Sequence, residues 1–205
     1  ALESALAHWL YHDEIWLRGN AKAKAEILLA IARVRHALVL FGGIVPRKAT
    51  THLRALLNDA DAVLLAADTA DEALFRTEVV GAKLALTEWL VQRGWRPFLN
   101  EAGEKKIAGS FKRFADIHLS RVAAELRSAV QHLAVEDAAD QLPKLSRDID
   151  SVQLLAGAYG DAVAPWLENW QELQRAIEHD DRSVFEYFRR QALAAEPFWL
   201  HSGKR

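Results

Sequence analysis

The chain has 205 residues, a length that suits one large domain or two small fused ones and that can bury a hydrophobic core without disulfides. It contains no cysteine, which excludes disulfides, thiolate metal sites and thiol nucleophiles, and which fits a reducing, cytoplasmic setting. Its formal net charge of −2 means that the whole molecule does not attract polyanions, so any basic function must come from a local patch.

The sequence also bears on membranes and on the ends of the chain. No apolar run approaches the about 18 residues of a membrane span, and no signal segment opens the chain, so we expect no membrane partner. Methionine is absent even from position 1, and a helix-like pattern begins at Leu2. We therefore expect the chain to be the processed or excised end of a longer protein.

Apolar residues recur every three or four positions almost everywhere, which predicts an all-α fold. The first half is predicted to contain helices at about Leu2–Leu17, Ala21–Phe41 and Lys48–Ala66, and from Thr69 or Asp71 to Gly94. Glycines at 19, 42 and 43 are typical of helix ends. Either Thr69 or Asp71 could cap the fourth helix.

The segment Arg93–Pro97 is rich in turn formers and predicts a midpoint between two halves of one domain, at about 1–95 and 96–205. A broken stretch, Pro97–Gly109, leads to a helix that is capped by Ser110 and runs to about Leu133. Three more helices are predicted at about Leu142–Tyr159, Asp161–Glu178 and Asp181–Ala195. Because the connections are short, neighbouring helices should be antiparallel, and the expected architecture is two antiparallel four-helix bundles.

The second predicted helix combines an apolar circumference with central basic groups. From Ile27 to Phe41 its apolar side chains cover nearly the whole circumference, which is typical of a buried helix. Arg33, Arg35 and His36 nevertheless lie in its middle, and buried charges are costly unless they are paired or face a wet cavity. Two interpretations stay open: carboxylates or solvent satisfy these groups, or the groups line a polar channel that awaits an anion.

The helix after Ser110 repeats this combination. Its expected core stripe consists of Phe111, Ala115, Leu119, Val122 and Leu126. Phe114, His118, Arg121 and Glu125 form a second strip directly beside the core stripe. A histidine and an arginine next to a core stripe favour the lining of a site, but an ion pair between Arg121 and Glu125 explains part of the pattern equally well.

Further basic residues lie near the starts of two other helices. They are Arg47, Lys48, His52 and Arg54 after Pro46, and Lys144 and Arg147 in the second half. The N-terminus of a helix offers free N–H groups to phosphate, so the first group is a candidate anion site. Asp148 and Asp150 weaken the field of the second group.

Other kinds of site find less support. His8 and His12 have the i, i+4 spacing that can chelate a metal, but no third ligand is apparent, so we predict no metal site. The sequence has neither a phosphate-binding glycine loop nor a nucleophile elbow, so no catalytic residue is predicted. The acidic balance and the absence of a nucleic-acid-binding motif argue against a nucleic-acid partner.

Four segments carry a resemblance to a known family. They are Phe41–Lys48, Lys83–Val91, Ser110–Arg121 and Glu196–Arg205. They resemble the CHAD module (conserved histidine α-helical domain) of bacterial CYTH–CHAD inorganic triphosphatases, and the resemblance spans essentially the whole chain. It implies two four-helix bundles related by a pseudo-two-fold axis, with a basic central cavity that binds inorganic polyphosphate.

The resemblance assigns roles to residues of the second helix. The family's signature helix reads His-x-x-Arg-Val-x-x-Arg-Arg-x-Arg before a Leu-x-Leu-Phe ending. When that ending is aligned on Leu38–Phe41, Arg33 and Arg35 fall on two signature arginines. Ala25 stands in the place of the histidine, and apolar residues replace the other two arginines.

The resemblance implies an accessory polyphosphate- or polyanion-binding domain that is not itself catalytic. In such proteins a separate N-terminal CYTH domain hydrolyses triphosphate with a divalent metal, so we expect no cofactor in this segment. The alternative is a structural scaffold that packs on the CYTH domain or mediates self-association. The candidate binding residues are Arg33, Arg35, His36, Arg47, Lys48, Arg54, His118, Arg121, Lys144 and Arg147.

Overall fold

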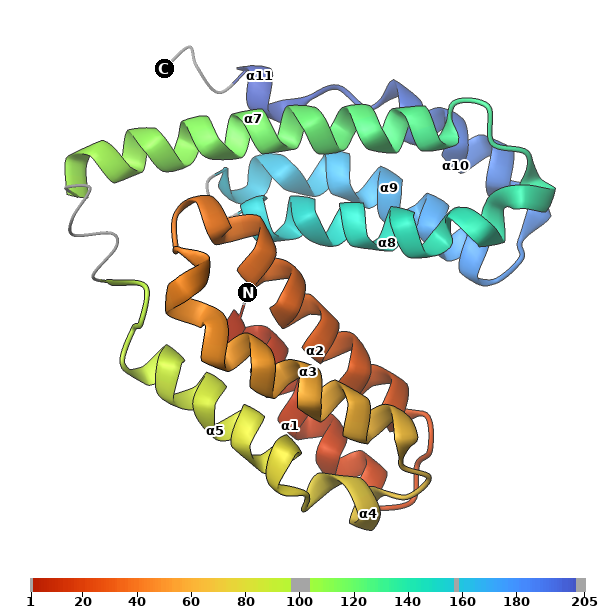
Figure 1. Ribbon diagram of the computed structural model, residues 1–205. Coiled ribbons are helices and arrows are strands. Elements are labelled where there is room, and N and C mark those ends of the chain that lie inside the picture. The colour runs from red at the N-terminus through yellow and green to blue at the C-terminus, as the bar shows by residue number, and fades with distance from the viewer. Residues whose placement is uncertain (1, 97–103, 157–158, 202–205) are drawn as a thin grey trace. The chain divides into compact units, whose positions relative to one another are not determined.

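The computed structural model describes residues 2–96, 104–156 and 159–201, with the side chains of 104–112, 200 and 201 left aside. These residues form helices and turns without a strand, which confirms the all-α class. Among them, no helix has both the length and the apolar character needed to cross a membrane. The chain divides into two compact units, Ala1–Glu104 (unit 1) and Lys105–Arg205 (unit 2), which are drawn in Figure 1 and described separately below.

In its described residues, unit 1 forms four longer helices and one short helix. They are α1 (Leu2–Leu17), α2 (Ala23–Leu40), α3 (Thr51–Ala66), α4 (Ala70–Leu74) and α5 (Thr77–Val91), with 3-10 turns at Phe41–Gly43 and Arg47–Thr50. Helix α1 packs along α2, and α3 packs along α5, while α2 also contacts α3 (Figure 1). Gly19 follows α1 with a φ of +94°, a conformation that glycine adopts without steric cost and that ends the helix.

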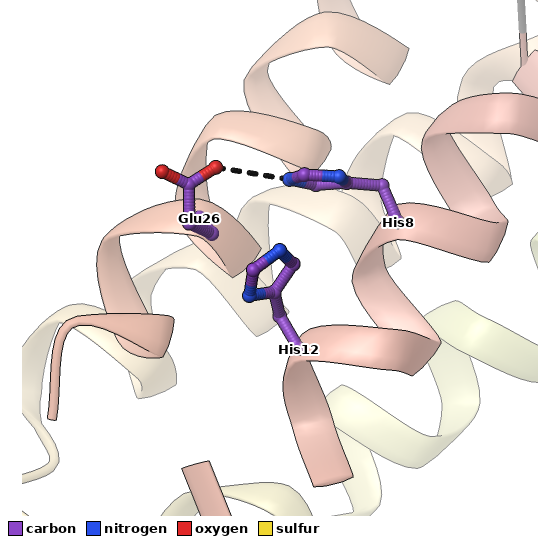
Figure 2. A group of neighbouring side chains, drawn as sticks. All are labelled: His8, His12 and Glu26. Atoms are coloured by element: carbon purple, nitrogen blue, oxygen red, sulfur yellow. Dashed lines mark hydrogen bonds and ion pairs between the residues drawn. The ribbon is translucent and has the colours of Figure 1, made fainter. Parts of the chain in front are cut away.

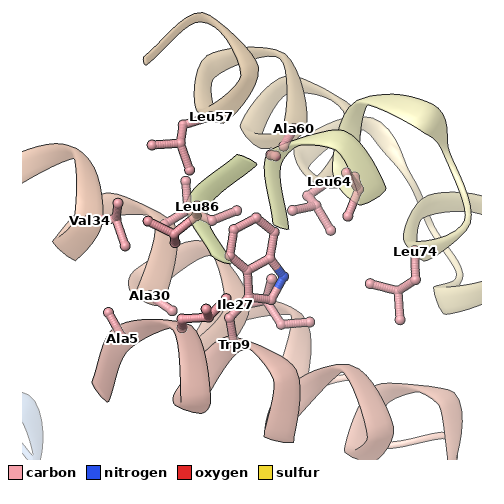
Figure 3. Close-up of a cluster of buried hydrophobic side chains, with 14 of the residues drawn as sticks. Ala5, Trp9, Ile27, Ala30, Val34, Leu57, Ala60, Leu64, Leu74 and Leu86 are labelled. Carbon is pink, nitrogen blue, oxygen red and sulfur yellow. The ribbon is translucent and has the colours of Figure 1, made fainter. Parts of the chain in front are cut away.

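The core of unit 1 is formed by side chains from all four longer helices (Figure 3). Trp9 of α1, Ile27 of α2, Leu57 and Leu64 of α3, and Leu86 of α5 are all completely buried. Removing one such side chain from water contributes about 1.5–3 kcal/mol, so this cluster holds the helices of unit 1 together.

The described residues of unit 2 include the helices α7 (Glu104–Val130), α8 (Ala138–Leu155), α9 (Ala164–Glu178), α10 (Arg182–Ala194) and the short α11 (Phe198–His201). Helix α9 packs against both α8 and α10. The Trp199 indole N–H donates to Ser120 Oγ at 3.0 Å, and the Arg127 guanidinium donates to the Ala195 carbonyl at 3.0 Å. These bonds attach the segment that follows α10 to α7.

Two predicted boundaries in the second half are wrong. Ser110 does not cap a helix, because α7 begins at Glu104 and Gly109 lies within it; residues 97–103 of the expected broken stretch are outside the described residues. A glycine inside a helix costs about 1 kcal/mol relative to alanine, which a helix of this length can absorb. Helix α8 begins at Ala138 rather than Leu142 and continues past Pro143, which has no N–H group to donate within the helix.

The predicted fourth helix is two helices, because the backbone becomes extended at Arg76 between α4 and α5. Thr69 is the cap of α4, since its hydroxyl accepts a hydrogen bond from the Glu72 N–H at 3.3 Å. The pseudo-two-fold relation between the halves stays a prediction.

Candidate functional site

One side of helix α2 is buried and the other faces solvent, although its sequence is apolar on nearly every side. Leu29 and Val39 are 38% and 65% exposed, so the prediction that this helix is buried all round is wrong. The side chains of Arg33, Arg35 and His36 are half-buried at the edge of the buried face. This position lets their polar ends reach water or a partner while their carbon atoms pack against the helix.

The three basic groups of α2 have partners. Arg35 Nη1 donates to Asp61 Oδ2 at 2.7 Å, an ion pair that joins α2 to α3. Arg33 and His36 also interact with neighbouring groups. For Arg35, the interpretation in which a carboxylate satisfies the charge is therefore correct.

A second group of cations lies where the chain passes from α2 to α3. We call Arg47, Lys48 and Arg54 the connection cluster. Arg54 Nε donates to Thr50 Oγ1 at 2.9 Å, and its Nη2 donates to the carbonyl of Leu38 in the last turn of α2. Arg54 is thus bonded to neutral oxygen atoms near the negative end of a helix dipole, and no carboxylate in the part of the chain that the structure describes forms an ion pair with it.

Two like charges of the connection cluster, those of Arg47 and Arg54, lie close enough to interact. Burial, and secondarily the positive charge of Arg47, lower the pKa of Arg54 below its usual value. An arginine remains cationic at neutral pH even so. The side chains of Arg47 and Lys48 are exposed, and neither forms an ion pair with another residue that the structure describes. The cluster therefore offers positive charge and unused N–H donors to an anion.

In unit 2, the strip on α7 is continuous. The rings of Phe114 and His118 lie 4.1 Å apart between centroids, His118 Nδ1 is 3.3 Å from Arg121 Nη2, and Arg121 Nε is 3.8 Å from Glu125 Oε1. Burial and the charge of Arg121 lower the pKa of His118, so the ring is neutral at pH 7. Because the arginine donates to Nδ1, the proton of the neutral ring is on Nε2, which remains a donor.

Basic residues of α8 lie near this strip. Asp148 is 6% exposed, and its pKa is raised by burial and then by the charge of Glu125, while Arg147, Lys144 and Arg121 oppose the shift. The cations of α7 and α8 thus act on the same carboxyl group. We call His118, Arg121, Lys144 and Arg147 the α7–α8 cluster. Predicted basic residues that are distant in sequence are brought together here, with two carboxylates among them.

The sequence match extends over both units: a family model described as the CHAD domain matches residues 1–190. The chain belongs to the CHAD domain family. In this CHAD domain the candidate cations form three groups, on α2, in the connection cluster and in the α7–α8 cluster.

One cavity of this CHAD domain does not fit a polyanion. It has a volume of about 270 Å³ and lies within unit 2, where its lining includes Glu136, Asp180, Asp181 and Arg182. Three carboxylates against one guanidinium would repel phosphate. The connection cluster and the α7–α8 cluster are better candidates.

The sequence analysis considered His8 and His12 together but did not identify Glu26 as their neighbour. It lies beside His8 and His12, with Glu26 Oε2 3.0 Å from His8 Nε2. The turn at Gly19 gives a signal that could have found it, since antiparallel helices bring residues at similar distances from a turn side by side. The third potential ligand, which was not apparent in the sequence, is therefore present on α2.

Proposed function

We propose that this CHAD domain is an accessory, non-catalytic module that binds inorganic polyphosphate or a closely related polyanion. The observation that carries the proposal is the connection cluster, where Arg47 acts on the charge of Arg54, Lys48 is the exposed neighbour of Arg47 in sequence, and none of the three has an ion-pair partner among the described residues. The α7–α8 cluster supports the same function with two guanidinium groups, one ammonium group and a neutral imidazole donor. The connection cluster is the stronger of the two, because Glu125 and Asp148 reduce the field of the other.

Phosphate chemistry suits these groups. A guanidinium presents parallel N–H donors that match two oxygen atoms of a phosphate, and a lysine adds a mobile point charge. A chain of phosphates can engage several such groups at once, so its affinity exceeds what one phosphate achieves. A single inorganic phosphate should therefore bind far more weakly than a long chain.

The wider context belongs to the same proposal. We infer a cytoplasmic inorganic triphosphatase in which an N-terminal CYTH domain holds the divalent metal and performs hydrolysis, while this CHAD domain binds polyphosphate. The family match supports the assignment of this domain, and the chain's own residues supply cations rather than a catalytic arrangement. No nucleic-acid or membrane partner is part of the proposal.

Isothermal titration calorimetry of the 205-residue chain with long-chain polyphosphate at low salt tests the proposal. We expect binding that weakens steeply with salt, by the counterion release that governs polyanion affinity. The double variant Arg47→Ala/Lys48→Ala should reduce the affinity by about tenfold and flatten its salt dependence, because each lost cation removes about one phosphate contact. Both substituted side chains are exposed, so the expected loss of affinity could not be explained by unfolding of the variant.

Arg18→Ala provides the matched control. Arg18 is an exposed arginine of the same unit, and it already has an i, i+4 partner in Glu14 at 3.4 Å. This variant should bind polyphosphate like the unmodified chain. The absence of binding at low salt, or an equal loss in the control and in the double variant, would reject the proposed site.

A second candidate function, as a scaffold, is favoured by an apolar stripe on α5. Val80, Leu84 and Val91 are 37%, 65% and 77% exposed, and they share one side of the helix. Such a stripe can pack on the CYTH domain or on a second copy of the chain. Leu84→Glu would then weaken that association without changing the polyphosphate affinity, which analytical ultracentrifugation and calorimetry would separate.

A further inference from the structure

Two histidines and a glutamate meet where α1 lies against α2 (Figure 2). His8 and His12 are one turn apart on α1, and Glu26 is in the first turn of α2. His8 Nε2 lies 3.0 Å from Glu26 Oε2, and the two imidazole rings are 4.3 Å apart between centroids. One potential ligand atom from each residue lies within 4.8 Å of the others.

The hydrogen bonds of the group do not explain His12. His8 has a carboxylate partner, but His12 Nδ1 is buried and has no hydrogen-bond partner among the described residues. A buried polar atom without a partner destabilises the folded state by about 1–3 kcal/mol. A role limited to tying α1 to α2 through His8 and Glu26 would not require an imidazole at position 12.

The donor set is that of a divalent transition metal. Two neutral imidazoles and one carboxylate are common ligands of Zn²⁺, whereas Mg²⁺ and Ca²⁺ prefer oxygen atoms alone. Ligands bound at about 2.1 Å in a tetrahedron are separated by about 3.4 Å. The three side chains can reach that spacing by small rotations, because their ligand atoms already lie within 4.8 Å.

The surroundings leave room for the fourth ligand. The side chains of His8 and Glu26 are 33% and 44% exposed, so water can reach the open coordination position. The rings of Tyr11 and His12 are nearly perpendicular, with 5.1 Å between their centroids, and this contact limits the movement of the imidazole. The site is thus partly fixed on one side and open on the other.

We propose that His8, His12 and Glu26 form a binding site for a divalent transition metal ion of the zinc type, which joins α1 to α2. The site completes its coordination with water and lies away from the connection cluster in sequence. An ion bound here stabilises the folded unit 1, since it binds the folded arrangement of two helices and not the separated segments. This proposal is independent of polyphosphate binding.

Titration with Zn²⁺ alone, followed by calorimetry, tests the stoichiometry, and Co²⁺ absorption in the visible range tests the coordination geometry. We expect one ion per chain and a melting temperature that rises with the metal concentration. His12→Ala should reduce the affinity at least tenfold, because a chelating ligand is lost while the bond between His8 and Glu26 remains. Glu26→Gln keeps the shape of the side chain and should also weaken binding.

His132→Ala is the control, because His132 is an exposed histidine of unit 2 that is not part of the group. It should leave the Zn²⁺ affinity unchanged, as should the Arg47→Ala/Lys48→Ala variant that tests the proposed function. Zn²⁺ binding of equal strength in the unmodified chain, in His12→Ala and in Glu26→Gln would overturn the assignment. The absence of any saturable binding to the folded chain would overturn it as well.

Discussion

Unit 1 and unit 2 are both helical, but they place their ion pairs differently. Unit 1 has local ion pairs, such as Arg18 with Glu14, but it also has ion pairs between separate helices. Lys83 Nζ of α5 is 2.7 Å from Asp13 Oδ2 of α1, and Arg35 Nη1 of α2 is 2.7 Å from Asp61 Oδ2 of α3. The first of these is largely buried, with side-chain exposures of 18% for Lys83 and 10% for Asp13. Charges in unit 1 thus help to hold one helix against another.

In unit 2, the ion pairs that the described residues show are local: most join residues three or four positions apart on one helix, and Arg182 bonds to Asp180 just before α10. Arg189 and Arg190 both bond to Glu186 on α10, and Arg175 bonds to Glu172 on α9. Polar contacts between elements of unit 2 include guanidinium groups that donate to backbone carbonyls, as Arg189 does to Val130 and Gln131.

The exposed apolar side chains explain part of this difference. Ten of the large hydrophobic residues that are exposed among the described residues belong to unit 1, and two, Ile117 and Tyr187, belong to unit 2. The helices of unit 1 are apolar on most sides, so few positions remain for pairs along one helix. The helices of unit 2 have a polar face on which such pairs form readily.

The largest effect is expected from breaking the buried pair of unit 1. Lys83→Met leaves Asp13 charged and without its partner, which should reduce the free energy of unfolding by about 3 kcal/mol. The pKa of Asp13, already raised by burial despite the hydrogen bond from Lys83, should rise further. Chemical denaturation at pH 7 measures the loss.

Two further variants sharpen this comparison. Arg175→Met removes an exposed pair of unit 2 and should change the free energy of unfolding by no more than about 0.5 kcal/mol. The double variant Asp13→Leu/Lys83→Met removes both charges and should be more stable than Lys83→Met alone. Equal losses for Lys83→Met and Arg175→Met would show that the two units do not differ in this respect.

In unit 2, a substitution of Asp148 should have a smaller effect on the free energy of unfolding, and this substitution should stabilise the chain. Asp148 is buried, its Oδ2 has no hydrogen-bond partner, and burial raises its pKa. A raised pKa means that the folded state loses stability as the pH rises above the usual value of 3.8 and through the higher value in the folded state. Asp148→Asn removes the charge, so it should stabilise the chain by about 1 kcal/mol at pH 7.

The gain from Asp148→Asn should disappear below pH 3.8, where the carboxyl group is protonated in both states. Thermal melting at pH 7 and at acidic pH measures this dependence. The same variant removes a negative charge from the neighbourhood of Arg121 and Lys144, so it should also strengthen polyphosphate binding. A destabilised Asp148→Asn at pH 7 would indicate that the carboxylate has a role in the structure.

The periodicity of apolar residues was sufficient to predict the fold class and the first helix, because burial of one helix face is a property of local sequence. It predicted Ala115, Leu119, Val122 and Leu126 as a core stripe, and all four are buried. The side chain of Phe111, which completes that prediction, lies outside the described residues. Helix starts were less predictable, because a proline or glycine does not fix where a helix that packs on its neighbours begins.

The partners of the charged residues could not be predicted from the sequence. Asp61 lies 26 positions after Arg35, and Asp13 lies 70 positions before Lys83, so only the packing of the helices brings them together. The sequence did indicate which cations lie near a core. It gave no means to distinguish Arg35, which has a carboxylate, from Arg54, which bonds to a carbonyl and a hydroxyl group.

The smallest expected effect concerns the ion pairs that Glu186 forms with Arg189 and Arg190 on α10. Hydrogen bonds from Arg189, and then from Arg190, lower the pKa of Glu186 to about 2. This carboxylate therefore contributes stability above the usual value of 4.5, and the contribution is lost as the pH falls toward the lower value of the folded state. NMR titration of the side-chain carboxyl carbon measures the pKa directly.

Arg190→Gln should raise the pKa of Glu186 only in part, because Arg189 Nε and Nη2 still donate to its two oxygen atoms at 2.8 and 2.9 Å. Arg189→Gln should raise it more and should also release the end of α7, since Arg189 Nη1 is the donor to the carbonyl groups of Val130 and Gln131. The carboxylate thus holds the guanidinium in place for a contact between helices, and a pair that appears local contributes to packing. If Glu186 titrates at its usual value in the unmodified chain, this coupling of local pairing to the packing of unit 2 is wrong.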